Sequence, residues 1–367
     1  KEQVTAMADN SFCDILNNQS NVFTQNHMEE IQMYFDLSGL WQADIGDGKV
    51  YPMQLPGTLD ENRIGHKDLG QNQWHPDAAL GNAEEGFNEN APIATRFTRK
   101  YTFEGEARLT RRISFTPEEG KRVFLEAERA RCLRLLVDGK EVPHFSEGSL
   151  STPHVFEVTG LLNGDNEITL LSDNSYPGLP HDAIVYSSAA TDETQTNWNG
   201  VLGYLRLRVE EPVFLSALRT YPDREGNTLT VQAEVSADRF WSGTLLVESG
   251  ALKKEKSGAQ EYAGYQKEIC VQPGLTRFVL EKLPLAGDVR RWDEEEGNLY
   301  ELTARLSAKE RQELASRTET FGVRTFGDNG KGRLALNGRV IFLRSEANCC
   351  EFPETGHPPM TVEEWMD

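Results

Sequence analysis

Short apolar runs separated by turn residues fill most of the chain from Asp36 onward, and the 3.6-residue period of helices is nearly absent there. In residues 201–209 the apolar Leu205, Leu207 and Val209 alternate with polar side chains, which predicts a strand with one buried face. Similar runs predict further strands at residues 123–127, 133–137, 167–171, 229–235, 241–248, 276–280 and 299–306. The pattern therefore predicts an all-β protein built from antiparallel sandwiches.

Turn and breaker residues divide this pattern into domains. Pro212 follows a strand and cannot extend its ladder, so we expect a domain boundary there. Residues 1–35 are polar and weakly periodic, which indicates an N-terminal arm. We expect a jelly-roll sandwich in residues 36–211 and an Ig-like sandwich in residues 212–322. The polar residues 253–265 are predicted to form an exposed hairpin loop.

The pattern changes in residues 323–367. Residues 334–343 read as a hairpin around an Asn337-Gly338 turn, and the second strand is almost wholly apolar. A continuous apolar strand indicates burial on both faces, as in a parallel α/β sheet. Thr361 and Glu364 form a capping box that predicts the start of a helix. We therefore expect the opening of an α/β unit whose remainder is missing.

Charge and composition exclude several classes of protein. The 367 residues include 38 Lys plus Arg against 58 Asp plus Glu, a net charge of -20, and no basic stripe occurs. Binding to nucleic acid or to an anionic membrane surface is therefore not expected. No apolar stretch approaches the roughly 20 residues of a membrane-spanning helix. The five scattered cysteines have no metal spacing, and no phosphate-binding glycine loop occurs, so no metal and no cofactor are predicted.

Several short segments, taken in order, carry a resemblance to a known family. They are residues 37–41 (LSGLW), 55–58 (LPGT), 96–101 (RFTRKY), 137–140 (VDGK), 151–154 (STPH), 172–174 (SDN), 194–203 (TQTNWNGVLG), 291–293 with 298–300 (RWD, NLY), and 321–324, 336–338 and 342–344 (FGVR, LNG, FLR). In this order the chain resembles glycoside hydrolase family 2, the family of bacterial β-galactosidases and β-glucuronidases.

The resemblance implies that this chain is part of a longer polypeptide whose catalytic residues lie in another domain. It makes residues 323–367 the first strand of a truncated (β/α)8 barrel. In the family, two Glu residues about 5 Å apart act as acid and nucleophile with retention of configuration, on later barrel strands. The chain ends before that context, so it is expected to contain no catalytic residue. The resemblance thus implies an inactive N-terminal part of an exo-β-glycosidase that hydrolyses terminal β-linked sugars.

Residues 192–198 are the strongest candidate for sugar binding. The resemblance implies that this loop reaches the active-site mouth, where Asp192, Gln195 and Asn197 could bond vicinal hydroxyls and Trp198 could stack on a pyranose. The alternative is a polar loop in which Trp198 is a core anchor, and both interpretations stay open. Asn197 replaces the Asp of the β-galactosidase pattern, which leaves the galactose preference and a sodium site open.

Two residues near the expected barrel strand complete the candidates, and other classes of function stay open. Arg344 and Glu346 are expected near the substrate. The implied partners are the terminal β-linked sugar of an oligosaccharide and the C-terminal barrel of the same polypeptide. A homo-oligomer stays open. The rival classes are a free-standing carbohydrate-binding protein and a purely structural sandwich.

The N-terminus bears on the compartment. Residues 1–32 lack the apolar core of a signal peptide, which favours a cytoplasmic location. The chain does not begin with Met, so removal of an upstream signal leaves a periplasmic or secreted location open.

Overall fold

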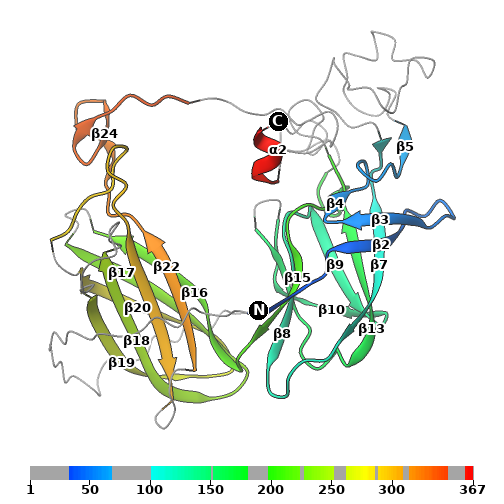
Figure 1. The fold of residues 1–367 in the computed structure, drawn as a ribbon, viewed down its shortest axis with the longest axis horizontal. Helices are drawn as coiled ribbons and strands as arrows, with labels where there is room; N and C mark the ends of the chain where they lie inside the picture. The colour runs from blue at the N-terminus through cyan, green and yellow to red at the C-terminus, as the bar shows by residue number, and fades with distance from the viewer. Residues whose placement is uncertain are drawn as a thin grey trace. The chain divides into compact units, whose positions relative to one another are not determined.

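The computed structural model describes residues 33–67, 101–149, 152–180, 197–223, 227–251, 262–285, 288–308, 314–345 and 360–366. These residues form two compact units, one of residues 33–209 with 360–366 and one of residues 210–345 (Figure 1). Each unit has its own hydrophobic core. The prediction of two all-β sandwiches in succession is thereby confirmed. The jelly-roll and Ig-like assignments and the domain limits stay predictions.

The first unit contains two large antiparallel sheets. One has the order β1(Met33–Asp36), β15(Leu205–Glu210), β8(Arg122–Ala127), β12(His154–Glu157) and β11(His144–Ser146). The other has the order β10(Lys140–Val142), β9(Cys132–Val137), β13(Gly164–Asp173), β7(Glu106–Phe115), β2(Gly39–Asp44) and β3(Tyr51–Leu55). Two short pairs join β4(Gly57–Thr58) to β14(Gly200–Val201) and β5(His66–Lys67) to β6(Tyr101–Thr102).

Alternation of side chains explains the core of this unit. Trp41, Leu109, Leu125 and Leu207 are at most 1% exposed and belong to one apolar cluster. Trp41 also satisfies its indole N–H, which donates to the carbonyl of Leu37 at 3.0 Å. Burial of these large side chains removes apolar surface from water and stabilises the two-sheet packing.

The β9–β10 hairpin forms as its sequence predicts. Asp138 and Gly139 have φ values of 48° and 76°, which match the left-handed turn required between the strands. The Asp138 carboxylate accepts hydrogen bonds from the Glu167 amide at 2.8 Å and the Asn166 side chain at 2.7 Å. These bonds, the Glu167 one first, lower the pKa of Asp138 and tie the turn to β13.

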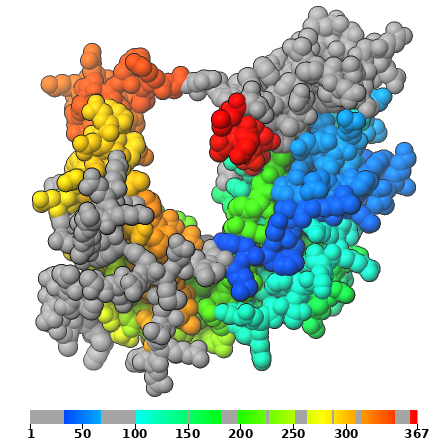
Figure 2. Space-filling view, in the orientation of Figure 1, coloured from blue at the N-terminus to red at the C-terminus, as the bar shows by residue number. Residues whose placement is uncertain are grey.

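The edge strand β1 departs from the predicted arm. Met33, Tyr34 and Phe35 pair with β15, although they were expected to precede the folded region. All three side chains are exposed, and no apolar alternation marks the strand. It is held by main-chain pairing with β15, by the Phe35–Phe115 ring contact at 5.2 Å and by Arg206, which lies 3.8 Å from the Tyr34 ring. The dark blue segment that contains β1 forms part of the surface in Figure 2.

The second unit is also a pair of antiparallel sheets. Their orders are β16(Val213–Pro222), β17(Thr228–Ala237), β20(Gly274–Pro284) and β19(Tyr262–Val271), β18(Trp241–Ala251), β21(Tyr300–Ser307), β22(Ala315–Phe321). Val231, Leu245 and Leu302 are fully buried in its core. Residues 262–265 lie in β19, so this described part of the predicted loop 253–265 is strand instead.

A small sheet follows, in the order β23(Phe326–Asp328), β24(Leu334–Leu336) and β25(Arg339–Val340). The Asn337-Gly338 turn is confirmed, with φ values of 52° and 82°. The prediction of a long apolar strand buried on both faces is wrong for the described residues, because β25 ends at Val340 and Phe342 is 87% exposed. An apolar run is buried only where other residues cover both of its faces.

The predicted helix start is confirmed. Helix α2(Val362–Met366) begins after Thr361, whose hydroxyl accepts the Glu364 amide while the Glu364 carboxylate accepts the Thr361 amide at 2.8 Å. No helix in the described residues is long and apolar enough to cross a membrane.

Candidate functional site

The predicted site residues fall into three groups. Asn197 and Trp198 lie together just before β14 and are 4% and 5% exposed. Arg344 is exposed beyond β25 in the second unit. Asp192, Gln195 and Glu346 lie outside the described residues. The structure therefore describes the C-terminal end of the predicted sugar loop, Asn197 and Trp198, which we call the loop root.

The indole of Trp198 is packed against a buried arginine. The Arg131 guanidinium lies 4.8 Å from the indole centre, and its Nε donates to the Trp198 carbonyl at 2.9 Å. Nη1 of Arg131 donates to the Tyr176 hydroxyl at 2.5 Å. Arg131 is 4% exposed, so these contacts form in a low-dielectric setting where hydrogen bonds and cation–π contacts strengthen. Arg131 thus fixes both the main chain and the ring at position 198.

Asn174 and Asn197 hold each other through their main chains. Nδ2 of Asn174 donates to the Asn197 carbonyl at 2.7 Å, and Nδ2 of Asn197 donates to the Asn174 carbonyl at 3.1 Å. Asn174 also donates to the Phe103 carbonyl at 2.8 Å and accepts the Gly105 amide at 2.9 Å. The Asn174 side chain therefore joins three stretches of backbone: the end of β13, residues 103–105 and residue 197.

Asn199 repeats this bridging from the other side. Its Nδ2 donates to the carbonyls of Gly105 at 2.9 Å and Ser172 at 3.1 Å, and it lies 3.3 Å from Oδ1 of Asn174. The Asn199 carbonyl accepts the Leu59 amide at 2.9 Å. We call Asn174, Asn197 and Asn199 the asparagine cluster. All three are at most 4% exposed, so their hydrogen bonds are needed to offset the loss of hydration.

A glycine contact completes the root of the loop. Gly200 pairs with Thr58 across β4 and β14 and has a φ of 137°. A Cβ atom there would stand 2.3 Å from the Gly57 carbonyl oxygen. Only glycine therefore allows the two backbones to approach at this point.

A pair of histidines, the buried His154 and the half-buried His144, lies next to the main chain of Arg131. His154 is 2% exposed, and its Nε2 lies 3.0 Å from the Arg131 carbonyl. Its Nδ1 accepts the Gly148 amide at 3.3 Å and lies 3.2 Å from Nε2 of His144. Burial lowers the pKa of both His154 and His144, which favours neutral rings. A neutral His154 with its proton on Nε2 satisfies this set of contacts.

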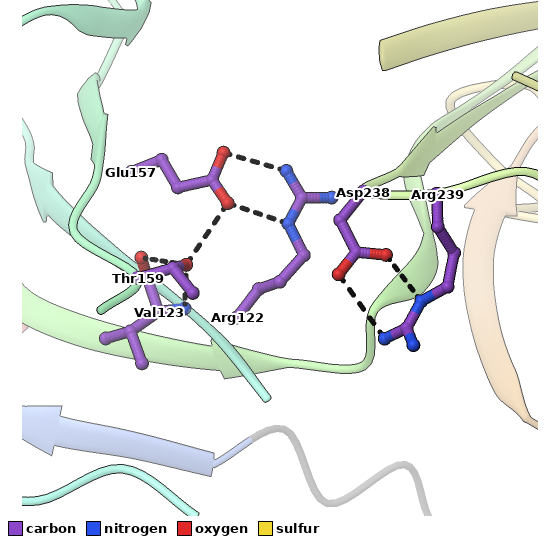
Figure 3. Close-up of polar contacts among 6 residues, drawn as sticks. All are labelled: Arg122, Val123, Glu157, Thr159, Asp238 and Arg239. Atoms are coloured by element: carbon purple, nitrogen blue, oxygen red, sulfur yellow. Dashed lines mark hydrogen bonds and ion pairs between the residues drawn. The ribbon is translucent and has the colours of Figure 1, made fainter. Parts of the chain in front are cut away.

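Charged groups order the outer face of β8 and its neighbours. Arg122 binds Glu157 through two hydrogen bonds of 2.8 and 2.9 Å, and the same carboxylate accepts the Thr159 hydroxyl at 3.1 Å (Figure 3). Glu126 accepts Arg206 at 2.9 Å and Arg208 at 2.6 Å. The carboxylates of Glu157 and Glu126 are thus hydrogen-bonded to arginines, which indicates that they stabilise the fold.

Among the described residues no group of three or more His, Cys, Asp and Glu side chains could hold a metal ion. The two cysteines in that part of the chain, Cys132 and Cys270, form no disulfide. Burial raises the pKa of the Cys132 thiol, which disfavours the reactive thiolate.

Sequence reasoning missed the contribution of Asn174, Asn199 and Arg131. Asn174 and Asn199 occur in the quoted segments 172–174 and 194–203, so their place in the chain was noted but not their role. Their partners are main-chain atoms of residues distant in sequence, which no local pattern encodes. The available signal was two asparagines flanking Trp198.

Two successive antiparallel β-sandwich units define the class of this chain by fold. No protein-family model and no curated protein matches the sequence. Solved structures of glycoside hydrolases share the fold. A putative β-galactosidase from Bacteroides fragilis matches with a TM-score of 0.59 and 16% identity, over 84% of this chain and 44% of that one.

Enzymes named for uronic acids match equally well. A Bacteroides uniformis β-glucuronidase has a TM-score of 0.59 and 18% identity, over 84% of this chain and 34% of that one. A family 2 β-galacturonidase from Eisenbergiella tayi, bound to galacturonate, has a TM-score of 0.56 and 19% identity, over 85% and 46%. The chain therefore spans less than half the length of these structures, and the likeness is one of fold.

Proposed function

We propose that this chain is the N-terminal, non-catalytic part of a retaining exo-β-glycosidase of glycoside hydrolase family 2. The proposal rests on two independent similarities to the family, one in sequence and one in fold. Sequence segments from residue 37 to residue 344 follow the family's order. The fold matches family enzymes over 84–85% of the same chain. Chance resemblance in short turns would not extend to the fold of two successive domains.

The proposed role of the chain is to shape the sugar site while another domain carries out the chemistry. Retaining hydrolysis needs an acid and a nucleophile on two carboxyl groups about 5 Å apart. In this proposal both lie in a C-terminal barrel of the same polypeptide, beyond Asp367. The jelly-roll and Ig-like domains occupy residues 36–211 and 212–322, and residues 323–367 enter the barrel.

Within that scheme Asp192 and Gln195 are the residues proposed to bond the hydroxyls of a terminal β-linked sugar. Carboxylate and amide groups are suited to this because each offers two polar atoms to vicinal hydroxyls. Arg344 and Glu346 are proposed to lie near the substrate at the barrel entrance. Burial of Asn197 and Trp198 supports a different role for these two, namely holding the root of the loop.

The test compares two lengths of the same polypeptide on chromogenic β-galactosides, β-glucuronides and β-galacturonides. We expect the product of the complete reading frame to hydrolyse at least one of them with retention. Residues 1–367 alone should show no turnover above the buffer background. Turnover by residues 1–367 would contradict the non-catalytic assignment. A complete product that is inert on all terminal β-glycosides, yet binds them, would instead favour a carbohydrate-binding protein.

A further inference from the structure

We propose that Asn174 is a positioning residue for the sugar site. It fixes the main chain at Asn197 and Trp198 relative to residues 103–105. The consequence for catalysis rests on the function proposed above, since it assumes that residues 192–198 shape a sugar site. The effect on the main chain does not depend on that assumption.

The position of Asn174 in the fold gives it this role. β13 ends at Asp173, and Asn174 is the next residue, so its backbone is anchored by a central strand of the six-stranded sheet. Asn197 lies three residues before β14, at the other end of the chain segment that leaves the sheet here. The reciprocal bonds of 2.7 and 3.1 Å close the two ends of this segment on each other.

The side chain of Asn174 also bonds to a third stretch of backbone, residues 103–105. Phe103 and Gly105 connect β6 to β7, and Asn174 bonds to both through a donor and an acceptor on one planar amide. The amide plane therefore sets the distance and the orientation between residues 103–105 and Asn197. No other side-chain type of this size presents a donor and an acceptor in this way.

Loss of Asn174 should displace the main chain without unfolding the unit. Asn199 independently links Gly105 to Ser172, and β4 pairs with β14 through Gly200 and Val201. These contacts keep the three stretches together when Asn174 is changed. What is lost is the side-chain link between residues 103–105 and the Asn197 carbonyl. The bonds of Asn197 Nδ2 to the Asn174 carbonyl and of Arg131 to the Trp198 carbonyl remain.

Asn166 provides a matched control on the same strand. It is 8% exposed, and its Nδ2 donates to the Asp138 carboxylate at 2.7 Å and to the Leu161 carbonyl at 3.3 Å. Its Oδ1 accepts the Asn163 amide at 2.9 Å. Asn166 thus makes the same kinds of bonds near the opposite end of β13. Asn166→Ala removes a comparable buried amide away from the loop root.

The first experiment measures amide hydrogen exchange in residues 1–367. In Asn174→Ala we expect the Gly105 amide to exchange at least tenfold faster than in the unchanged chain. In Asn174→Asp, which keeps an acceptor for that amide, Gly105 should stay within threefold while the resonances of Asn197 and Trp198 shift. In Asn166→Ala the Asn163 amide should exchange faster and Gly105 should not. Unchanged exchange at Gly105 in Asn174→Ala would overturn the proposal.

The second experiment measures kcat/KM of the complete enzyme on several β-glycosides, well below the thermal midpoint of each variant. Asn174→Ala should lower kcat/KM at least tenfold and change the ratio between sugars, whereas Asn166→Ala stays within twofold. A merely structural role would lower both variants alike and leave the ratio unchanged, and that result would overturn the positioning role. An inactive unchanged enzyme would refute the proposed function instead, and the exchange data would then decide the effect of Asn174 on the main chain.

Discussion

At the scale of single residues, burial limits what Asn197 and Trp198 can contribute. Both side chains are at least 95% buried; Asn197 bonds to the backbone of Asn174, and Trp198 packs against the guanidinium of Arg131. In the proposed function, groups engaged in this way influence a bound sugar through the backbone that they hold. The residues that would touch sugar are then the other members of residues 192–198, such as Asp192 and Gln195.

Asn197→Ala should therefore reduce catalysis indirectly. Removing its amide breaks the bond to the Asn174 carbonyl and leaves that buried acceptor to find another donor. We expect a loss of about 2–4 kcal/mol of transition-state stabilisation in the complete enzyme. The measurement is kcat/KM on the best substrate, with the thermal midpoint recorded in parallel. A value within twofold of the unchanged enzyme would show that position 197 does not influence the site.

His154 should make the first unit sensitive to acid. Burial holds its pKa below the usual value near 6.5, against the opposing hydrogen bonds to the Ala130 and Arg131 carbonyls, and the neighbouring His144 lowers it further. Above about pH 6.5 both folded and unfolded states keep the ring neutral. As the pH falls below this value the unfolded chain takes up the proton first, and stability is lost. His144 shifts in the same direction and adds to the effect.

Urea unfolding between about pH 5 and 8 measures this dependence. We expect the free energy of unfolding of the first unit to fall with decreasing pH, by up to about 1.4 kcal/mol per pH unit for each histidine. His154→Asn should have a shallower slope, and the exposed His66→Asn should keep the original one. An identical slope in all three proteins would show that His154 does not govern the acid response.

At the scale of elements, several strands and turns could be predicted from the residues that form them. Residues 123–127 and 133–137 were predicted as strands because their apolar side chains suit a sheet, and they form β8 and β9. The apolar run after Arg339 failed as a strand because burial depends on neighbours that a run does not itself specify. The same reason hid the asparagine cluster, since its partners Phe103 and Gly105 lie in the connection between β6 and β7, far away in sequence.

Gly200→Ala tests the close approach of β4 and β14. A Cβ atom at 2.3 Å from the Gly57 carbonyl oxygen, on a backbone with φ of 137°, forces the two strands apart. We expect destabilisation of about 2–4 kcal/mol. Gly139→Ala is a suitable control, because a Cβ there meets nothing within 4 Å although φ is also positive. Equal thermal midpoints for the two variants would contradict the steric explanation.

At the scale of the whole molecule, two separate cores indicate two cooperative units. Each core is a continuous apolar cluster confined to one side of the Val209–Glu210 boundary. A sandwich of this size can bury enough apolar surface to fold on its own. Substitutions in one core should therefore leave the stability of the other unchanged.

Leu125→Ala and Leu302→Ala provide the comparison. Both side chains are fully buried, one in each core, so each change should cost about 2–5 kcal/mol through lost packing and a cavity. Calorimetry should resolve two transitions, with Leu125→Ala lowering one and Leu302→Ala lowering the other. A single transition that both variants shift equally would mean that the two units unfold as one.

The asparagine cluster has a consequence for how this protein can evolve. Asn174 and Asn199 bond to carbonyl groups of residues 103, 105 and 172, which any residue supplies, and to the amide of residue 105, which any residue except proline supplies. Apart from position 105, where a φ of 138° favours glycine, the anchor therefore does not depend on the side chains of the residues that it holds. Selection, or an engineer, can exchange the residues between the two anchored ends as a cassette while the frame that presents them stays the same.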